Sequence, residues 1–231
     1  MNIDFIYNGV VHSVQISQTA NRKISEGLGL VVQTYHFSIE QIQTLRIQND
    51  AGTCFNCPLS FSANNGKSGG CYTHKGRIFL AILSKLKRLR GAYLAGKITA
   101  YDEKVHKKII KIANAGSYLR LGSYGEAVTM PEKLIRDICE AIPKRTAYTH
   151  LWTDKNYQWA KQFFMASTDG NKFLSDIAQN MGWRYFNIGQ TDGVQCPSDP
   201  TINKEKRVPC ERCNLCGGAN KKAKNVWIKQ H

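Results

Sequence analysis

SYLRLGS (residues 117–123), TAYTHLW (146–152), FFMAST (163–168) and RYFNIG (184–189) are four short apolar segments, each with the composition of a β-strand. Between them, the spacing of apolar residues predicts helices at 132–141, about 156–161 and 171–181. Strands that alternate with helices favour a parallel sheet with right-handed crossovers. The sequence therefore predicts an α/β fold built from parallel βα units.

Two architectures remain open for this sheet. Because no glycine-rich dinucleotide fingerprint follows any of the predicted strands, we prefer a partial or small (β/α) barrel. An open, doubly wound sheet is the alternative.

The chain before these strands has a different composition. Residues 1–50 are polar and mixed, and we expect them to form an N-terminal segment of strands with a hairpin turn at Asn8-Gly9. A short strand is predicted at 44–49. Amphipathic helices are predicted at 77–95 and 103–113.

Two polar, cysteine-bearing stretches flank the predicted βα units. One is the Gly-, Ser- and Asn-rich segment 51–76, and the other is the Gly- and Lys-rich segment 190–231. Loops of this length inside a compact domain are usually functional or held by a ligand. We therefore expect residues 51–231 to be one compact βα domain with two metal-binding loops.

Composition and charge limit the class of protein. The chain has 231 residues, of which 42% are hydrophobic, enough for a folded core. Its net charge of +15 favours an anionic partner, DNA or RNA before a membrane surface. The longest apolar run, Ile78–Leu83, is too short to span a membrane. Since the start also lacks the pattern of a signal peptide, we expect no membrane association and a cytoplasmic location.

Seven of the eight cysteines fall into two groups with short spacings, C-x2-C-x13-C and C-x13-C-x2-C-x2-C. Thiols clustered in this way in a reducing compartment more often bind metal than form disulfides. We predict as metal ligands Cys54, Cys57 and Cys71 in the first group and Cys196, Cys210, Cys213 and Cys216 in the second. The remaining Cys139 is expected to be buried in a helix.

The spacing of the second group favours iron over zinc. Three cysteines within seven residues, Cys210 to Cys216, match the run that holds iron–sulfur clusters in bacterial ferredoxins. We expect one or two clusters, [4Fe–4S] in preference, with Cys196 completing the second group and an open or non-cysteine position in the first. Structural zinc and a redox-active thiol pair or disulfide are the alternatives.

Candidate catalytic residues lie where the predicted strands end. Glu126, His150 and Asp169 follow the first three strands, and the carboxyl ends of parallel strands carry the active sites of βα folds. These side chains are suited to acid–base chemistry. The structural alternatives are a buried core histidine at position 150 and, favoured over catalysis, a helix cap at position 169. Both cysteine groups are expected to meet on this same face.

Lysines and arginines gather in two segments. In the first, we expect Lys85, Arg88 and Arg90 to stand on the solvent side of the helix 77–95 and to contact phosphates of DNA or RNA. The second segment is the C-terminal tail, with Lys204, Lys206, Arg207, Arg212, Lys221, Lys222, Lys224 and Lys229. The alternative for each segment is a solvated face without a partner.

Four motifs, in their order along residues 50–231, resemble a family of uncharacterised bacteriophage cysteine-rich proteins. They are Cys57-Pro58 with Gly70-Cys71-Tyr72, LRLGSYGE (119–126), TAYTHLW (146–152) and the run from Cys210 to Cys216. The resemblance implies a phage origin and a cysteine-bound metal but no particular activity. The layout is also loosely similar to that of radical-SAM enzymes, whose C-x3-C-x2-C signature Cys54, Cys57 and Cys71 do not match.

The sequence thus favours a phage-type iron–sulfur protein. The alternatives are a nucleic-acid-binding protein with structural zinc or a cluster and, third, a radical-SAM-like or redox enzyme, with SAM not expected as a cofactor. Whether the chain is an enzyme stays open.

Overall fold

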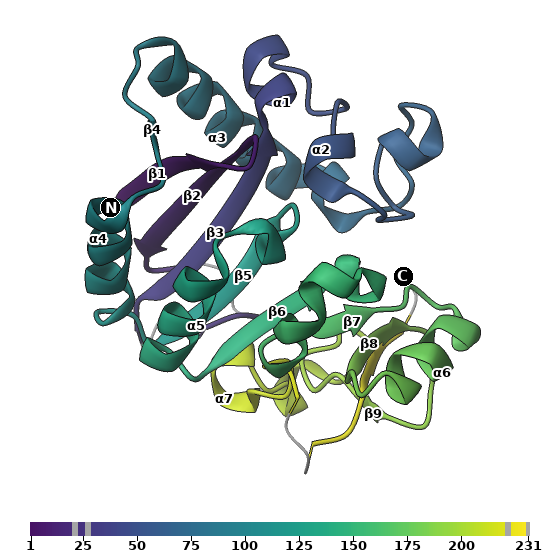
Figure 1. The fold of residues 1–231 in the computed structure, drawn as a ribbon. Helices are drawn as coiled ribbons and strands as arrows, with labels where there is room; N and C mark the ends of the chain where they lie inside the picture. The colour runs from purple at the N-terminus through teal and green to yellow at the C-terminus, as the bar shows by residue number, and fades with distance from the viewer. Residues whose placement is uncertain (20–22, 26–28, 220–222, 230–231) are drawn as a thin grey trace.

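The computed structural model describes residues 1–19, 23–25, 29–219 and 223–229 (Figure 1). Lys221 and Lys222 of the predicted basic tail lie outside the described residues. The strands are β1 (Asn2–Tyr7), β2 (Val10–Ser17), β3 (Val31–Ser38), β4 (Thr99–Ala100), β5 (Tyr118–Tyr124), β6 (Arg145–Thr149), β7 (Met165–Ser167), β8 (Tyr185–Ile188), β9 (Val194–Gln195) and β10 (Val226–Ile228). The α-helices are α1 (Ile39–Thr44), α2 (Ala51–Cys54), α3 (Gly76–Leu94), α4 (Glu103–Ala113), α5 (Glu132–Ala141), α6 (Lys172–Asn180) and α7 (Cys210–Cys213). Short 3₁₀ helices cover Ser62–Asn64, Tyr72–His74, Ala127–Thr129, Leu151–Thr153, Lys155–Gln162 and Lys204–Lys206.

All of these strands belong to one sheet, in the order β4-β1-β2-β3-β5-β6-β7-β8-β10-β9. The pairs β1–β2 and β2–β3 are antiparallel, and the other neighbours are parallel. The four predicted strands are β5 to β8, and their parallel pairing confirms the α/β class. Because β3 pairs with β5, residues 1–50 continue the same sheet.

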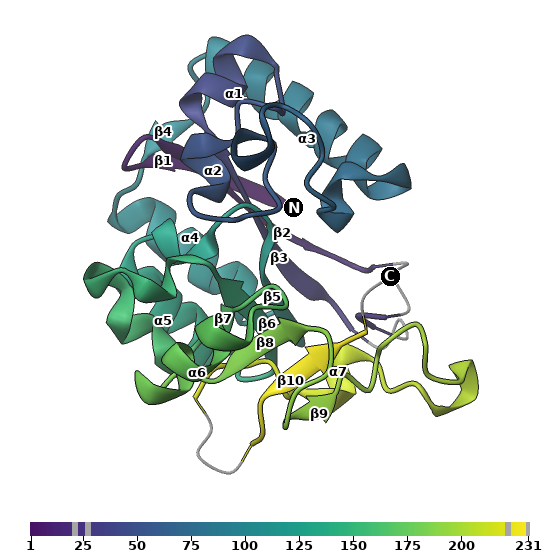
Figure 2. The same cartoon turned by 90° about the vertical axis from the view of Figure 1, so that its right-hand side faces the viewer.

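The predicted barrel is not formed by the described residues. A barrel needs its first and last strands to pair, whereas β4 and β9 end the sheet as unpaired edges of two residues each. The N-terminal antiparallel strands extend the sheet outward beyond β5. The result is an open, mostly parallel sheet with helices on both faces, as Figure 2 shows.

Each face of the sheet buries its own apolar cluster. On one face, α4 and α5 pack with Ile109 and Ile138 against Leu119 and Leu121 of β5. On the other face, α1 and α3 pack with residues such as Leu86 against Val11, Phe37 and Tyr124. The two helices predicted on the N-terminal side are confirmed as α3 and α4. In the part of the chain that the structure describes, no helix has the length and apolarity needed to cross a membrane.

Two local features of residues 1–50 were predicted from the sequence, a hairpin turn and a strand. The hairpin turn at Asn8-Gly9 is confirmed, with φ of 48° and 74° for the two residues. The strand predicted at 44–49 is wrong. The hydroxyl of Ser38 accepts from the Gln41 amide in a capping box, which starts α1 directly after β3 and carries the chain in a helix to Thr44.

Candidate functional site

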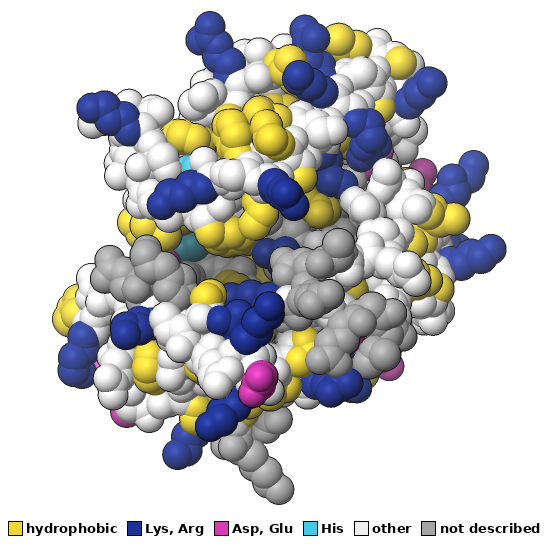
Figure 3. Space-filling view, turned by 180° about the vertical axis from the view of Figure 1, so that it is seen from behind, with side chains coloured by type: hydrophobic (Ala, Val, Ile, Leu, Met, Phe, Trp, Pro, Cys, Tyr) yellow, Lys and Arg dark blue, Asp and Glu magenta, His cyan; other side chains and the backbone are white. Residues whose placement is uncertain are grey.

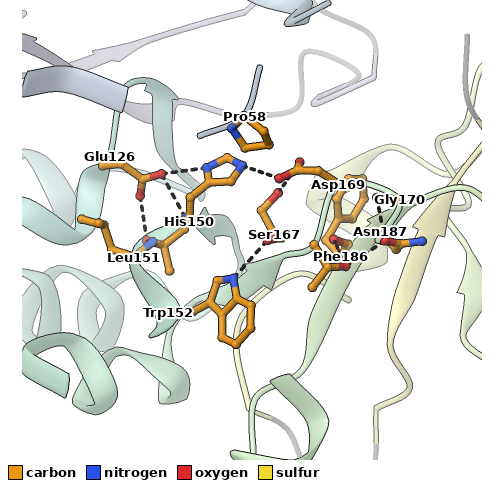
Figure 4. A network of polar contacts seen from close by, with 12 residues as sticks. Pro58, Glu126, His150, Leu151, Trp152, Ser167, Asp169, Gly170, Phe186 and Asn187 are labelled. Atoms are coloured by element: carbon orange, nitrogen blue, oxygen red, sulfur yellow. Dashed lines mark hydrogen bonds and ion pairs between the residues drawn. The ribbon is translucent and has the colours of Figure 1, made fainter. Parts of the chain in front are cut away.

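Three side chains from neighbouring parallel strands meet at the carboxyl edge of the sheet. Glu126 follows β5, His150 follows β6 and Asp169 follows β7. Figure 4 shows the imidazole of His150 between the two carboxylates. The sequence prediction that these three residues lie together is therefore confirmed in space, while their chemical role stays a prediction.

The imidazole is held on both sides. His150 Nδ1 lies 2.9 Å from Glu126 Oε1, and His150 Nε2 lies 2.9 Å from Asp169 Oδ2. The Nε2 contact is an ion pair by distance, because its N–H is not aligned for a hydrogen bond. The second Glu126 oxygen accepts from Thr149 Oγ1 at 2.7 Å, and Oε1 also accepts from the His150 amide at 3.0 Å. Glu126 is therefore oriented by three donors at once.

Electrostatics keep this histidine charged. Burial alone lowers the pKa of His150, but its contacts with Asp169, Cys57 and Glu126 outweigh burial and hold that pKa well above 6.5. An imidazolium between two carboxylates leaves the trio with one net negative charge. In this state His150 is a proton donor or a fixed cation, rather than a ready general base.

Asp169 does not act as the predicted helix cap. The cap of α6 is Asn171, whose side chain accepts from the Leu174 amide. Asp169 instead stands in the left-handed region with φ of 48°, and its Oδ1 accepts from Ser167 Oγ at 3.0 Å. Asp169 and Gly170 both have positive φ, as in a tight turn, and this turn directs the Asp169 carboxylate toward His150.

The first cysteine group is brought to this edge by Thr53. Its hydroxyl accepts from the Ser38 amide at the end of β3 at 2.7 Å, and its carbonyl accepts from the Glu126 amide at 3.0 Å. Buried Asp50 then accepts from the amides of Phe61 and Ser62, both at 2.8 Å, and so closes the following loop. The loop therefore lies at the carboxyl edge as predicted, although α1 and an irregular segment after Thr44 lead into it in place of the expected strand.

The thiols of this first group interact with one another and with the trio. Burial raises the pKa of Cys54 most strongly, with smaller electrostatic contributions from Cys57, Cys71 and Glu126. Cys57 contacts His150, and Pro58 lies beside the same imidazole in Figure 4. Three thiols and an acid–base trio thus share one edge of the sheet.

The second cysteine group assembles from two segments. Cys196 interacts electrostatically with Cys210 and Cys213, and Cys216 interacts with all three. Burial is the main cause that raises the pKa of Cys196 to about 11. The expectation that Cys196 joins the C-terminal run is met in space.

Only Cys196 of this second group directly follows a strand, β9, whereas the C-terminal run lies along β6 and not at the carboxyl edge that we expected. The carbonyl of Cys216 accepts from the Ala147 amide within β6 at 3.0 Å, and Asn214 Oδ1 accepts from the Arg145 amide at the start of that strand at 3.1 Å. Cys196 and Cys216 pack with Met165 and Val226 on a face of the sheet. The hydrogen bonds of Asn214 and Cys216 to β6 keep the C-terminal run away from the ends of the strands.

Neither group has the geometry of a metal site as it stands. Among the described residues, no three His, Cys, Asp or Glu side chains are gathered closely enough to hold a metal ion. His74 stacks on Phe61 with ring centroids 3.7 Å apart. Cys139 is buried in α5 as predicted, where burial raises its pKa to about 12. Metal binding therefore stays a prediction.

Helix α3 is oriented as predicted, with Ile82, Leu86 and Leu89 buried, but one of its three predicted phosphate-binding side chains is not on the solvent side. Lys85 points onto the sheet, with Nζ 2.5 Å from Gln15 Oε1 and 4.0 Å from the ring centroid of Tyr35. Arg88 forms an ion pair with Asp4 at 2.6 Å, and Arg90 donates to the Gln43 carbonyl at 3.3 Å. The prediction of a solvent-facing Lys85 is wrong, because its long side chain reaches over α3 to the strands beneath.

Several polar residues near these groups were not singled out from the sequence. Thr149 orients Glu126, Arg120 projects from the middle of β5, and Tyr72 follows Cys71 and accepts from Arg120. The signal for Arg120 was available as a charged residue inside an otherwise apolar strand. Thr149 and Tyr72 carried no such signal, since each is common in strands and loops.

Comparison of the chain with protein-family models, curated proteins and solved structures finds no match in any of the three. The functional argument therefore depends on the geometry alone.

Proposed function

We propose that the protein binds iron–sulfur clusters, [4Fe–4S] in preference, through its two cysteine groups. The observation that carries the proposal is that Cys196 and Cys216, from segments far apart in sequence, pack in one buried cluster, with Cys210 and Cys213 on the same C-terminal run as Cys216. Burial raises the pKa values of Cys196, Cys213 and Cys216, so these three thiols are poor at existing as free thiolates. A metal centre removes this cost, because it binds the thiolate form.

The two groups suit different roles. The second group offers four thiolates and closes a structural centre. The first offers Cys54, Cys57 and Cys71, with a fourth position left for another ligand beside His150. An exchangeable position next to an acid–base trio is where a redox or radical-SAM-like reaction would take place, and this activity is the less favoured extension of the proposal.

Anaerobic purification followed by absorption spectroscopy and iron, sulfide and zinc analysis tests the proposal. Clusters of the [4Fe–4S] type should give a broad absorption at ~400 nm and equal amounts of iron and sulfide. Stoichiometric zinc without iron would show that the protein binds structural zinc and not an iron–sulfur cluster. Protein without either metal, even after anaerobic reconstitution, would overturn the proposal.

Nucleic-acid binding is the second candidate, favoured by the net charge of +15. Lys and Arg side chains are spread over the face in Figure 3, where acidic ones are few. Since Lys85 and Arg88 are engaged within the fold, exposed Arg77 and Lys87 of α3 are better candidates for phosphate contacts. A salt titration of oligonucleotide binding with Arg77→Glu and Lys87→Glu tests this, and each lost contact lowers the salt slope by about one unit.

The phage origin and the cytoplasmic location stay predictions from the sequence.

A further inference from the structure

Arg120 lies between the two cysteine groups. It projects from β5 opposite Gln33 of β3 and Thr146 of β6. Its Nη2 donates to Tyr72 Oη at 2.8 Å, next to Cys71 of the first group. On its other side it interacts electrostatically with Cys210 of the second group. One side chain therefore links regions that are far apart in sequence.

Among the residues that the structure describes, the guanidinium of Arg120 has no acidic partner. No carboxylate of a described residue forms an ion pair with it, and the described residues provide one hydrogen-bond acceptor, Tyr72, for its five N–H donors. Arg120 is only partly exposed, so water cannot solvate it fully. A partly exposed guanidinium with few protein acceptors is suited to binding an anion.

Solvent reaches the contact between Arg120 and Tyr72. The face seen in Figure 3 is hollowed between its two halves, with Lys or Arg atoms visible in the hollow. Tyr72 is 52% exposed, and its hydroxyl, which accepts from Arg120, still has a proton to donate. Lys85 approaches Tyr35, which interacts with Arg120. Cations and hydroxyl donors therefore converge from β5, α3 and the first cysteine loop.

We propose that Arg120 and Tyr72 bind the oxyanion of a small phosphorylated or carboxylated ligand at their partly exposed contact beside Cys71. The planar guanidinium matches two oxygens of such a group, and the tyrosine hydroxyl adds a third donor. This site goes beyond the proposed metal binding and does not depend on it. A ligand held here has its remaining atoms free to extend toward Cys71.

Calorimetric titration of the full chain at low, constant ionic strength tests the site, with inorganic phosphate, adenosine monophosphate and malonate as separate probes. The unmodified chain should bind at least one of them, and the comparison of phosphate with malonate identifies the preferred oxyanion. Arg120→Gln should weaken binding by at least about tenfold, since a charge-assisted contact is lost. Tyr72→Phe should weaken binding by about threefold. Arg136→Gln, which breaks the surface pair with Glu132, is the matched control and should bind as the unmodified chain does.

Because Arg120→Gln can fail to fold, Arg120→Lys and the exposed Tyr72→Phe keep the test decisive. Arg120→Lys retains the positive charge but lacks the planar pair of N–H donors, and should weaken binding less than Arg120→Gln. No binding of any probe by the unmodified chain would overturn the proposal. So would binding that neither Tyr72→Phe nor the Arg120 variants change. If the Arg120 variants lost metal while anion affinity stayed constant, Arg120 would be a countercharge for the thiolates and the anion site would be wrong.

Discussion

The two cysteine groups have similar spacings but lie in different environments. The first is carried by a loop that Thr53 and Asp50 fasten to the strand ends, where Cys57 meets the charged His150. The second is built from two segments that pack against β6 and β10 on a face of the sheet, with Cys216 buried. Spacing alone therefore determines which thiols can gather. The sheet decides whether the gathered thiols face a reactive edge or a packed surface.

The largest effect is expected from the second group. Cys213→Ser should lose the metal of that group, and the melting temperature should fall by about 10 °C or more, since the free energy of metal binding is folding free energy. Metal analysis and thermal unfolding measure both. Cys139→Ala is the control, because Cys139 lies in α5 among apolar residues of the other face. Full metal content and unchanged melting of Cys213→Ser would show that the two groups do not differ as described.

A smaller effect is expected where the first group meets the trio. Glu126→Gln keeps the shape but removes the charge that faces His150, and should cost about 3 kcal/mol of unfolding free energy. Asp169→Asn should cost about half as much, because Asp169 is more exposed and its contact with Nε2 is not aligned as a hydrogen bond. Urea unfolding compares the two variants. Equal losses would mean that the two carboxylates hold His150 equally.

The stability of the fold should also depend on pH through two buried histidines that belong to neither cysteine group. Burial lowers the pKa of His12 to about 3 and, together with His12, the pKa of His36 well below 6.5. Because these histidines stay neutral in the folded chain, their stability contribution is complete above about pH 6.5 and falls as the pH drops below it, by about 1.4 kcal/mol per pH unit for each. Urea unfolding between pH 7 and 5 measures this slope. His12→Gln should remove about half of it, and an unchanged slope would contradict the assignment.

The smallest effect on stability is expected from the first group itself. Triple replacement of Cys54, Cys57 and Cys71 by Ser should lower the unfolding free energy by less than Cys213→Ser does, because the loop stays fastened by Thr53 and Asp50 after its metal is lost. It should remove the metal of the first group and leave the second intact, as measured by iron and zinc analysis. Loss of all metal in one step would instead indicate a single cluster shared by both groups.

Much of the βα half could be predicted because its signals are local. β5 to β8 and helices α3 to α5 follow from apolar periodicity, and the meeting of Glu126, His150 and Asp169 follows from the parallel pairing of consecutive strands. The strand predicted at 44–49 failed because the capping box of Ser38 outweighed a short apolar pattern. The exposed position predicted for Lys85 failed because helical periodicity does not show where a long side chain ends.

The sequence by itself determined the strands and helices of the βα units, the two sets of thiols and the three residues at the strand ends. Each of these depends on neighbours within a few positions along the chain. Only the tertiary structure decided that the sheet stays open, that the C-terminal cysteine run lies along β6, and that Arg120 contacts Tyr72 with no carboxylate partner among the described residues. Such outcomes depend on contacts between segments far apart in the chain. Many combinations of those contacts suit the same local pattern, and packing selects one of them.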